Sequence, residues 1–317
     1  MTITKAGVAI LDALSSGHEA TPSDLMKDTT YSQEHVYRVI DDLLAAGLLT
    51  ESRGPHNQRR VRVTDDPVVE TYRRLNSKLG HVQWSEVLSP ATLRICWYLD
   101  QPRRIAAIAD RLGISRQGAH KALSPIKNRA ILSPAGPEYA LAEDLKPLLE
   151  FVQAIITNEH RTKVRSLASS AMVEWCDPIR ALVRTREPKD TDILRSAEDW
   201  QLTGLAKFQE FGLQFFLSGE PAFRYGPTEE LTPVEVICHT LMLSSDSRRM
   251  SYAMLLIEQA EIDRDALIST ASWYGLETEV SEICRALQGD FTPTDDGETH
   301  LPSESEYSAL KAQYEVA

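Results

Sequence analysis

Several common features are missing from this 317-residue chain, and each absence excludes a class of protein. No apolar run approaches the roughly 20 residues that a membrane-spanning helix needs. The start, MTITKAGVAILDALSSG, has neither a basic segment nor a cleavage site, so we expect a cytoplasmic protein without a signal peptide. The four cysteines lie far apart with no C-x-x-C pair, which favours buried free thiols over a zinc or redox site: Cys96, Cys176, Cys238 and Cys284.

Lysine is also scarce, with 10 Lys against 24 Arg, and the formal net charge is −12. The charge is unevenly placed. Residues 1–157 carry 19 Lys/Arg against 18 Asp/Glu, whereas residues 158–317 carry 15 against 28. An acidic, lysine-poor composition is typical of proteins from salt-loving archaea, whose carboxylates keep the surface hydrated. Because the acid excess lies in the C-terminal half, it does not exclude nucleic-acid binding by the N-terminal half.

The most informative stretch is residues 30–64, which predicts a helix followed by a hairpin. Ser32 suits an N-cap, with its hydroxyl accepting from a free backbone N–H of the first turn. The apolar residues behind it recur at helical spacing, and Gly47 ends the helix. Residues 48–51 and 60–64 then predict two strands joined by a turn that contains Gly54, Pro55 and Asn57.

Polar and basic side chains on this helix and hairpin are candidate DNA contacts. On the helix they are Ser32, Gln33, His35, Tyr37 and Arg38; on the hairpin they are Arg53, His56, Arg59, Arg60 and Arg62. No acid lies between Arg53 and Arg62, which favours phosphate or minor-groove contact over a solvated basic surface. Asp41 and Asp42 would repel phosphate, so they mark where the helix would leave the groove.

A second unit repeats the first at a constant offset, which aligns Ser115 with Ser32. Helices are expected at 105–112 and 115–130, joined by a turn at Gly113-Ile114. The offset aligns Ala119 with Val36 and Ile126 with Leu43, so that apolar residues of the first unit correspond to apolar or small residues of the second. The candidate DNA contacts of this unit are Ser115, Arg116, Gln117, His120 and Lys121. Its hairpin, residues 133–141, has no basic residue, so the unit either contacts DNA through its helix or serves as a dimer or partner surface.

The coarse organisation is α+β and mainly helical. We expect two tandem winged helix-turn-helix domains (1–80 and 81–157), a mixed α/β domain with a helical bundle (158–291) and an acidic, solvated tail (292–317) that includes a short helix at 307–314. A helix at 66–79 would link the first domain to the second and carry a dimer contact, and a helix at 145–156 would close the second domain. The further expected strands are 171–175, 181–184, 213–217 and 222–225, and the further expected helices are 202–211, 234–243, 247–259, 263–274 and 277–287.

Residues 1–157 resemble tandem winged helix-turn-helix regulators of the MarR/ArsR type, which are widespread in archaea. The likeness rests on the helix pattern at 105–123, its echo at 22–40 and the basic hairpin at 50–64. It implies a recognition helix in the major groove and a wing on the backbone or in the minor groove. The C-terminal half is similar to the effector half of AbiEi-type antitoxins, through Thr203-Gly204-Leu205-Ala206 and the proline-led segment 233–243.

No catalytic or metal-binding constellation stands out. Asp190 and Asp192 have the spacing of a nucleotidyltransferase metal pair, but the upstream Gly-Ser turn of that chemistry is missing, and the pair is expected in a loop at 186–192. Cys176 has no histidine near it in sequence, and His239 lies in an apolar helix typical of a core. We therefore expect no enzyme, no cofactor and no metal.

The sequence predicts a sequence-specific, DNA-binding transcription regulator that represses. Double-stranded DNA is the expected partner and a homodimer the expected state. The C-terminal domain is expected to dimerise, or to sense a small molecule or a protein. An antitoxin-like regulator that neutralises a partner protein, and a plasmid or viral replication or partition protein, are the alternatives.

Overall fold

The computed structural model describes residues 3–127, 129, 131–215, 220–227, 230–292 and 300–316. Within these residues the protein is α+β and mainly helical with small antiparallel sheets, which confirms the predicted fold class. The chain divides into two compact units, Met1–Lys163 and Val164–Ala317. No helix of the described part is long and apolar enough to cross a membrane.

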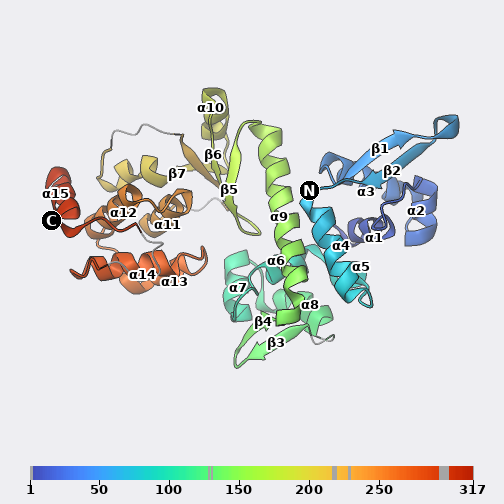
Figure 1. Cartoon of the computed structure of the whole chain (residues 1–317), viewed down its shortest axis with the longest axis horizontal. Helices are drawn as coiled ribbons and strands as arrows, with labels where there is room; N and C mark the ends of the chain where they lie inside the picture. Colours follow the sequence, from blue (N-terminus) through green and yellow to red (C-terminus); the bar gives the residue numbers. More distant parts are fainter. Residues whose placement is uncertain are drawn as a thin grey trace. The chain divides into compact units, whose positions relative to one another are not determined.

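Unit 1 begins with a group of three helices, a hairpin and a fourth helix (Figure 1). These elements are α1 (Lys5–Ala13), α2 (Pro22–Thr29), α3 (Gln33–Ala45), β1 (Leu49–Arg53), β2 (Arg59–Val63) and α4 (Pro67–Leu79), with a short 3-10 turn, η1 (Pro55–Asn57), at the hairpin tip. Thr21 caps α2 in a capping box with Asp24. Ser32 occupies the N-cap position of α3, but its side chain makes no capping hydrogen bond, so that detail of the prediction is wrong.

A second group in the same unit follows the same order after the short helix α5 (Trp84–Val87). Its elements are α6 (Pro90–Trp97), α7 (Ile105–Leu112), α8 (Arg116–Lys127), β3 (Leu132–Ala135), β4 (Glu138–Leu141), the 3-10 turn η2 (Glu143–Leu145) and α9 (Lys146–Leu167). The interval from the start of α2 to the start of α7 is the same as that from α3 to α8 and from β1 to β3. Gly113 ends α7 at φ 66°, a left-handed conformation that glycine adopts without strain.

Each hairpin is extended by one bridge to the segment before the second helix of its group. Ala20 and Val61 exchange backbone hydrogen bonds of 3.0 and 2.9 Å, and Arg103 and Tyr139 exchange bonds of 3.0 and 2.9 Å. Arg103 follows Ala20 by the same interval that relates the helices. The two groups therefore share backbone pairing as well as element order.

The helix α9 is longer than its sequence suggests. It was expected to end at residue 156, but it continues without a break to Leu167, across the boundary between the two units. Its N-terminal part buries Leu148, Phe151, Val152 and Ile155 within unit 1. These residues recur at helical spacing and form one apolar face.

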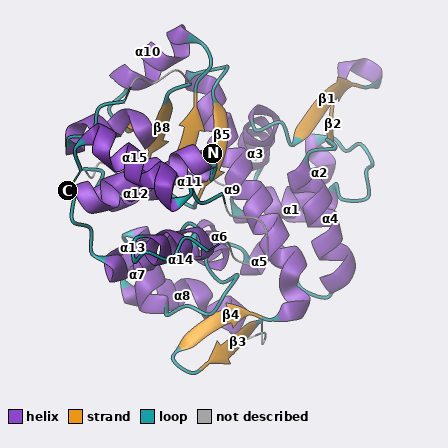
Figure 2. Cartoon of the chain, turned by 60° about the vertical axis from the view of Figure 1, so that its left-hand side comes forward, coloured by secondary structure: helices purple, strands orange, loops and turns teal. Residues whose placement is uncertain are grey.

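Unit 2 contains a four-stranded antiparallel sheet in the order β5-β6-β8-β7. Figure 2 labels two of its strands, β5 and β8. The strands are β5 (Met172–Cys176), β6 (Ala181–Arg184), β7 (Trp200–Thr203) and β8 (Ala222–Tyr225), and α10 (Pro188–Ser196) follows β6. A small core packs Val164 and Ala168 with Val183, Leu194 and Phe223. The helix expected at 202–211 is wrong in part, because β7 precedes a 3-10 helix, η3 (Gly204–Phe211). Of the strand expected at 213–217, residues 213–215 are not a strand, and the other two lie outside the described residues.

A helical group completes unit 2: α11 (Pro233–Leu243), α12 (Ser247–Gln259), α13 (Arg264–Ala271), α14 (Glu277–Ala286) and α15 (Glu304–Tyr314). Its core centres on α12, from which eight consecutive residues, 250–257, are buried. Thr232 caps α11 with Glu235 in a capping box.

The C-terminal segment is not a solvated tail along its described length. In α15, Tyr307 is buried, and its hydroxyl donates to Glu258 of α12. Lys311 pairs with the same carboxylate at 3.1 Å, and Phe215 lies edge-on to Tyr314. Residues 293–299, also predicted to belong to the tail, lie outside the described residues.

Candidate nucleic-acid interface

The first half of α3 presents polar side chains, as predicted from sequence. Gln33 and Arg38 are exposed, whereas His35 and Tyr37 are half-buried. The His35 ring lies 5.2 Å from the ring of Tyr31, and its Nδ1 is 2.7 Å from an Arg38 guanidinium nitrogen. Helical spacing therefore brings His35 and Arg38 together on one face of the helix.

The first hairpin is attached to α3 through Arg59. Its guanidinium donates to Asp41 at 2.6 Å and to Glu51 at 2.8 Å, and it lies 5.9 Å from the centre of the Tyr37 ring. Burial alone would lower the pKa of Arg59, but hydrogen bonds to the two carboxylates outweigh it and raise the pKa above the ordinary value. Asp41 was expected only to repel phosphate at the point where the helix leaves the groove. In the structure its carboxylate binds Arg59 of the same chain.

The other basic residues of the first hairpin differ in their exposure. Arg53 and Arg62 are exposed, and Arg53 lies 3.8 Å from Glu51 in a weak surface pair. His56, at the tip, is exposed and left-handed at φ 56°. Arg60 is half-buried beside Gly54, where a Cβ would come within 2.5 Å of the arginine Nε. Glycine at position 54 therefore makes room for the Arg60 side chain.

The second group presents its polar residues differently. Arg116, Gln117, His120 and Lys121 are all exposed, and their spacing of one, three and one places them on one face of α8. Across the described residues, none of the four has an ion pair or a side-chain hydrogen bond within the chain. No acid occurs between positions 115 and 130. Ser115 caps the helix by accepting from the Gly118 N–H at 3.0 Å.

The remaining charges near α8 have partners. Lys127 lies 4.2 Å from the centre of the Tyr139 ring and so joins the helix to its hairpin by a cation–π contact. Arg104 is paired with Glu138 at 3.9 Å and Arg129 with Glu86 at 3.6 Å, both on the surface. The second hairpin has no basic residue, as predicted, so the positive surface of this group is the helix itself.

A basic pocket between α4 and α9 was missed from sequence. It encloses about 170 Å³ and is lined by Arg74, Ser77, Lys78, Lys146, Pro147 and Glu150. Glu150 pairs with Arg74 at 3.2 Å, so the positive charge of the lining comes mainly from Lys78 and Lys146. Lys78 and Lys146 come from helices that are separated in sequence by α5–α8 and the second hairpin, so no local pattern could have joined them.

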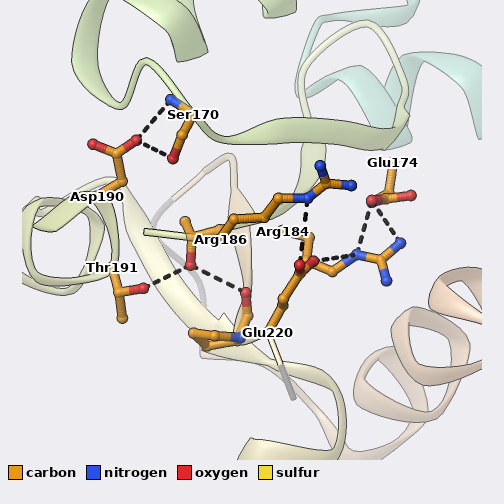
Figure 3. A network of polar contacts seen from close by, with 9 residues as sticks. Ser170, Glu174, Arg184, Arg186, Asp190, Thr191 and Glu220 are labelled. Atoms are coloured by element: carbon orange, nitrogen blue, oxygen red, sulfur yellow. Dashed lines mark hydrogen bonds and ion pairs between the residues drawn. The ribbon is translucent and has the colours of Figure 1, made fainter. Parts of the chain in front are cut away.

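The carboxylates considered for a nucleotidyltransferase do not form a pair. They lie in α10 rather than in the predicted loop, so that prediction is wrong. Asp190 accepts from the Ser170 N–H at 2.7 Å and from its hydroxyl at 2.6 Å, and these bonds lower the pKa of Asp190 (Figure 3). Asp192 is instead on the surface beside Arg195 at 3.7 Å. Asp190 therefore has a structural role, joining the end of α9 to α10.

The rest of this polar network also stabilises the sheet of unit 2. Arg184 donates to Glu174 at 2.7 Å and lies 3.6 Å from Glu220, which also pairs with Arg186 at 3.3 Å (Figure 3). The described residues contain no group of three His, Cys, Asp or Glu that could hold a metal ion. The four cysteines are free and buried, as predicted, and burial raises the pKa of Cys96 to about 12.

Comparison with known proteins assigns only the C-terminal part of the chain. A family model for a C-terminal domain of a haloarchaeal protein family, HVO_2833_C, matches residues 197–316, which is less than half of the chain. A search of curated proteins gave no match. These comparisons give no evidence for the likeness to winged helix-turn-helix regulators or to AbiEi-type antitoxins, which therefore remain predictions. What they show is a similarity to a haloarchaeal C-terminal domain over residues 197–316.

Proposed function

We propose that this chain is a sequence-specific DNA-binding transcription regulator that represses, in a haloarchaeal cell. In this proposal each group of unit 1 is a winged helix-turn-helix, with α3 and α8 as recognition helices. Unit 2 senses a small molecule or a protein partner. The acid excess of residues 158–317 supports this division of labour, because a surface of that charge repels phosphate.

The observation that carries the proposal is the exposed face of α8. Arg116 and Gln117 have the side chains that bind guanine and adenine edges in the major groove, and Lys121 suits a phosphate. Side chains that form no hydrogen bond or ion pair with the described residues can bind a ligand without first breaking such a contact. The absence of acids along the helix removes the repulsion that would oppose a phosphate backbone.

Fluorescence anisotropy over a potassium chloride series tests the proposal. The probe is a duplex enriched by the wild-type protein from a random-sequence library, with unselected duplex as competitor. We expect competitor-resistant binding that the Arg116→Ala/Lys121→Ala variant weakens by about 10- to 100-fold. The slope of log affinity against log salt should become shallower by about one, since Lys121 is the residue of the pair that is proposed to contact a phosphate, whereas the loss of Arg116 removes a base contact.

The matched control removes the same two positive charges from unit 2. Arg195→Ala/Arg264→Ala changes exposed side chains of α10 and α13 and should leave affinity and slope unchanged. Equal losses in both variants would mean that only net charge matters and would contradict sequence-specific reading. If no duplex is enriched at all, the proposed function is wrong.

A further inference from the structure

The two groups of unit 1 meet through equivalent helices. The helix α4 follows the first hairpin and α9 follows the second. Tyr72 is the sixth residue of α4, Phe151 is the sixth residue of α9, and their rings lie edge to face with centroids 5.3 Å apart. Contact between equivalent positions is what a two-fold axis produces, because a residue on the axis meets its own counterpart.

Further contacts fix this junction. Arg74 of α4 pairs with Glu150 of α9 at 3.2 Å. Farther along α9, Asn158 donates to the Ala46 carbonyl at the end of α3 at 3.3 Å, and Glu159 accepts from the Ile3 N–H at 3.0 Å. The first group is therefore held to the second by buried rings and by polar contacts at several points.

The hairpins of the two groups lie on opposite sides of the junction. Both views place the β1–β2 hairpin above α4 and the β3–β4 hairpin below the lower end of α9 (Figures 1 and 2). This placement is the one that a two-fold axis through the α4–α9 junction would produce. A homodimer of single winged helices has the same relation between its subunits, with one recognition helix for each half of a DNA site.

The two helices that would read DNA are not alike. Exposed Gln33 and Arg38 of α3 are followed by Asp41 and Asp42, whereas α8 exposes two cations, a glutamine and a histidine without any acid. Unlike side chains bind unlike base edges. The two parts of a site bound by such a pair would therefore differ in sequence.

We propose that one chain occupies a two-part, asymmetric DNA site as a monomer, with α3 reading one part and α8 the other. This inference rests on the proposed function and deepens it. Winged-helix dimers read half-sites about one helical turn apart, or a multiple of it, roughly 10 base pairs for one turn. Because both helices belong to one chain, the second contact forms at a high effective concentration, and a second copy of the protein is not needed.

The first test is stoichiometry and footprint on the enriched duplex described above. Sedimentation of the complex should give one chain per duplex. Hydroxyl-radical footprinting should show two protected segments of different sequence, with centres separated by about 10 base pairs or a multiple of that distance. Two chains on a palindromic footprint would overturn the proposal and leave the proposed function standing.

The second test assigns each segment to one helix. Gln33→Ala/Arg38→Ala should remove protection from one segment and Arg116→Ala/Lys121→Ala from the other, each with a loss of about 10- to 100-fold in affinity. Arg195→Ala/Arg264→Ala serves again as the charge-matched control. If both helix variants lose the same segment, or if the α3 variant has no effect, the two-part reading is wrong.

A third test changes the spacing between the two DNA segments and needs no protein variant. Inserting about five base pairs between the segments turns one of them by half a helical turn, so the chain can hold only one at a time. The chain then keeps the segment that it binds more tightly, so affinity should fall to that of the helix variant with the smaller loss. Unchanged affinity would contradict the proposal. Circular dichroism checks that each variant is folded, and Gln substitutions at Arg116 and Lys121 replace Ala if it is not. Failure to enrich any duplex counts against the proposed function itself.

Discussion

The two helix–hairpin groups of unit 1 share their element order, but their basic residues lie on different elements. In the first group the basic residues concentrate on the hairpin, and Arg59 is bound by Asp41 and Glu51. In the second group the hairpin has no basic residue, and the cations are exposed on α8. The number of cations in a segment therefore does not indicate how many of them are available to a ligand.

This difference changes which group should dominate DNA affinity. Moving an arginine from two carboxylates to a phosphate exchanges one set of charge-assisted hydrogen bonds for another, so the net gain is small. A side chain that is exposed to water and has no such bonds gives up only hydration and mobility. We therefore expect the second group, whose hairpin has no basic residue, to make the larger electrostatic contribution to DNA affinity.

The largest effect is expected where the two groups meet. Phe151 is fully buried against Tyr72, and Phe151→Ala leaves a cavity at the junction. We expect a loss of about 3–5 kcal/mol in the free energy of unfolding of unit 1, measured by urea denaturation. Phe151→Leu, which keeps most of the apolar volume, should lose clearly less. Independent folding of the two groups, with only one of them destabilised, would show that the junction does not unite them.

Salt dependence should separate the cations of the two groups. Lys121→Ala removes an exposed charge, so the slope of log affinity against log salt should become shallower by about one. Arg59→Ala removes a charge that Asp41 and Glu51 already neutralise, so its slope should stay close to that of the wild type. Anisotropy titrations of both variants measure this difference. Equal changes in slope would mean that Arg59 leaves its carboxylates when DNA binds.

The clamp between the first hairpin and α3 should contribute modestly to stability. Arg59 and Asp41 are 2.6 Å apart, but the Asp41 side chain is 63% exposed, so solvent screens much of the attraction. A double-mutant cycle with Arg59→Ala and Asp41→Ala should give a coupling of about 0.5–1 kcal/mol that decreases at high salt. A coupling that is zero at low salt would show that the hairpin is not held by this pair.

The smallest effect concerns the matching contact of the second group. Lys127→Met keeps the aliphatic stem on Tyr139 but removes the cation. The free energy of unfolding should fall by about 0.5–1 kcal/mol, as expected for an accessible cation–π contact. Tyr139→Leu, combined with Lys127→Met, should show that the two changes are not additive. Additive losses would mean that the two side chains do not interact.

Sequence reasoning succeeded where the signal is local. The starts of α2 and α11 have such a signal, because Thr21 and Thr232 are each followed by proline and by an acid at the third helical position. The same kind of signal, Pro188 followed by Asp190, precedes α10, but the segment was read as a loop. The constant offset between the two groups was visible from the hydrophobic pattern alone. The elements α7, α8 and β3 keep it relative to α2, α3 and β1, whereas β4 and α9 follow β2 and α4 at a shorter interval because the second hairpin is shorter.

Features that depend on distant partners could not be predicted. Trp200–Thr203 is a strand because it pairs with β8, which follows only after η3 and the segment behind it. The helix α15 packs on α12 through Glu258, which is far from Tyr307 in sequence. The contact between Arg59 and Asp41 joins a strand to the preceding helix and converts part of the candidate DNA surface into an internal clamp. Local propensity contains no information about such pairs.

Internal repetition also determines how the molecule can change over generations. In a homodimer every substitution appears twice, so a change that improves one side is imposed on the other. In this chain the two groups have the same element order but are encoded by different parts of one gene. A mutation in α8 leaves α3 untouched, and the reverse holds as well. Each copy can therefore drift, specialise or lose its original role while the other preserves the ancestral one.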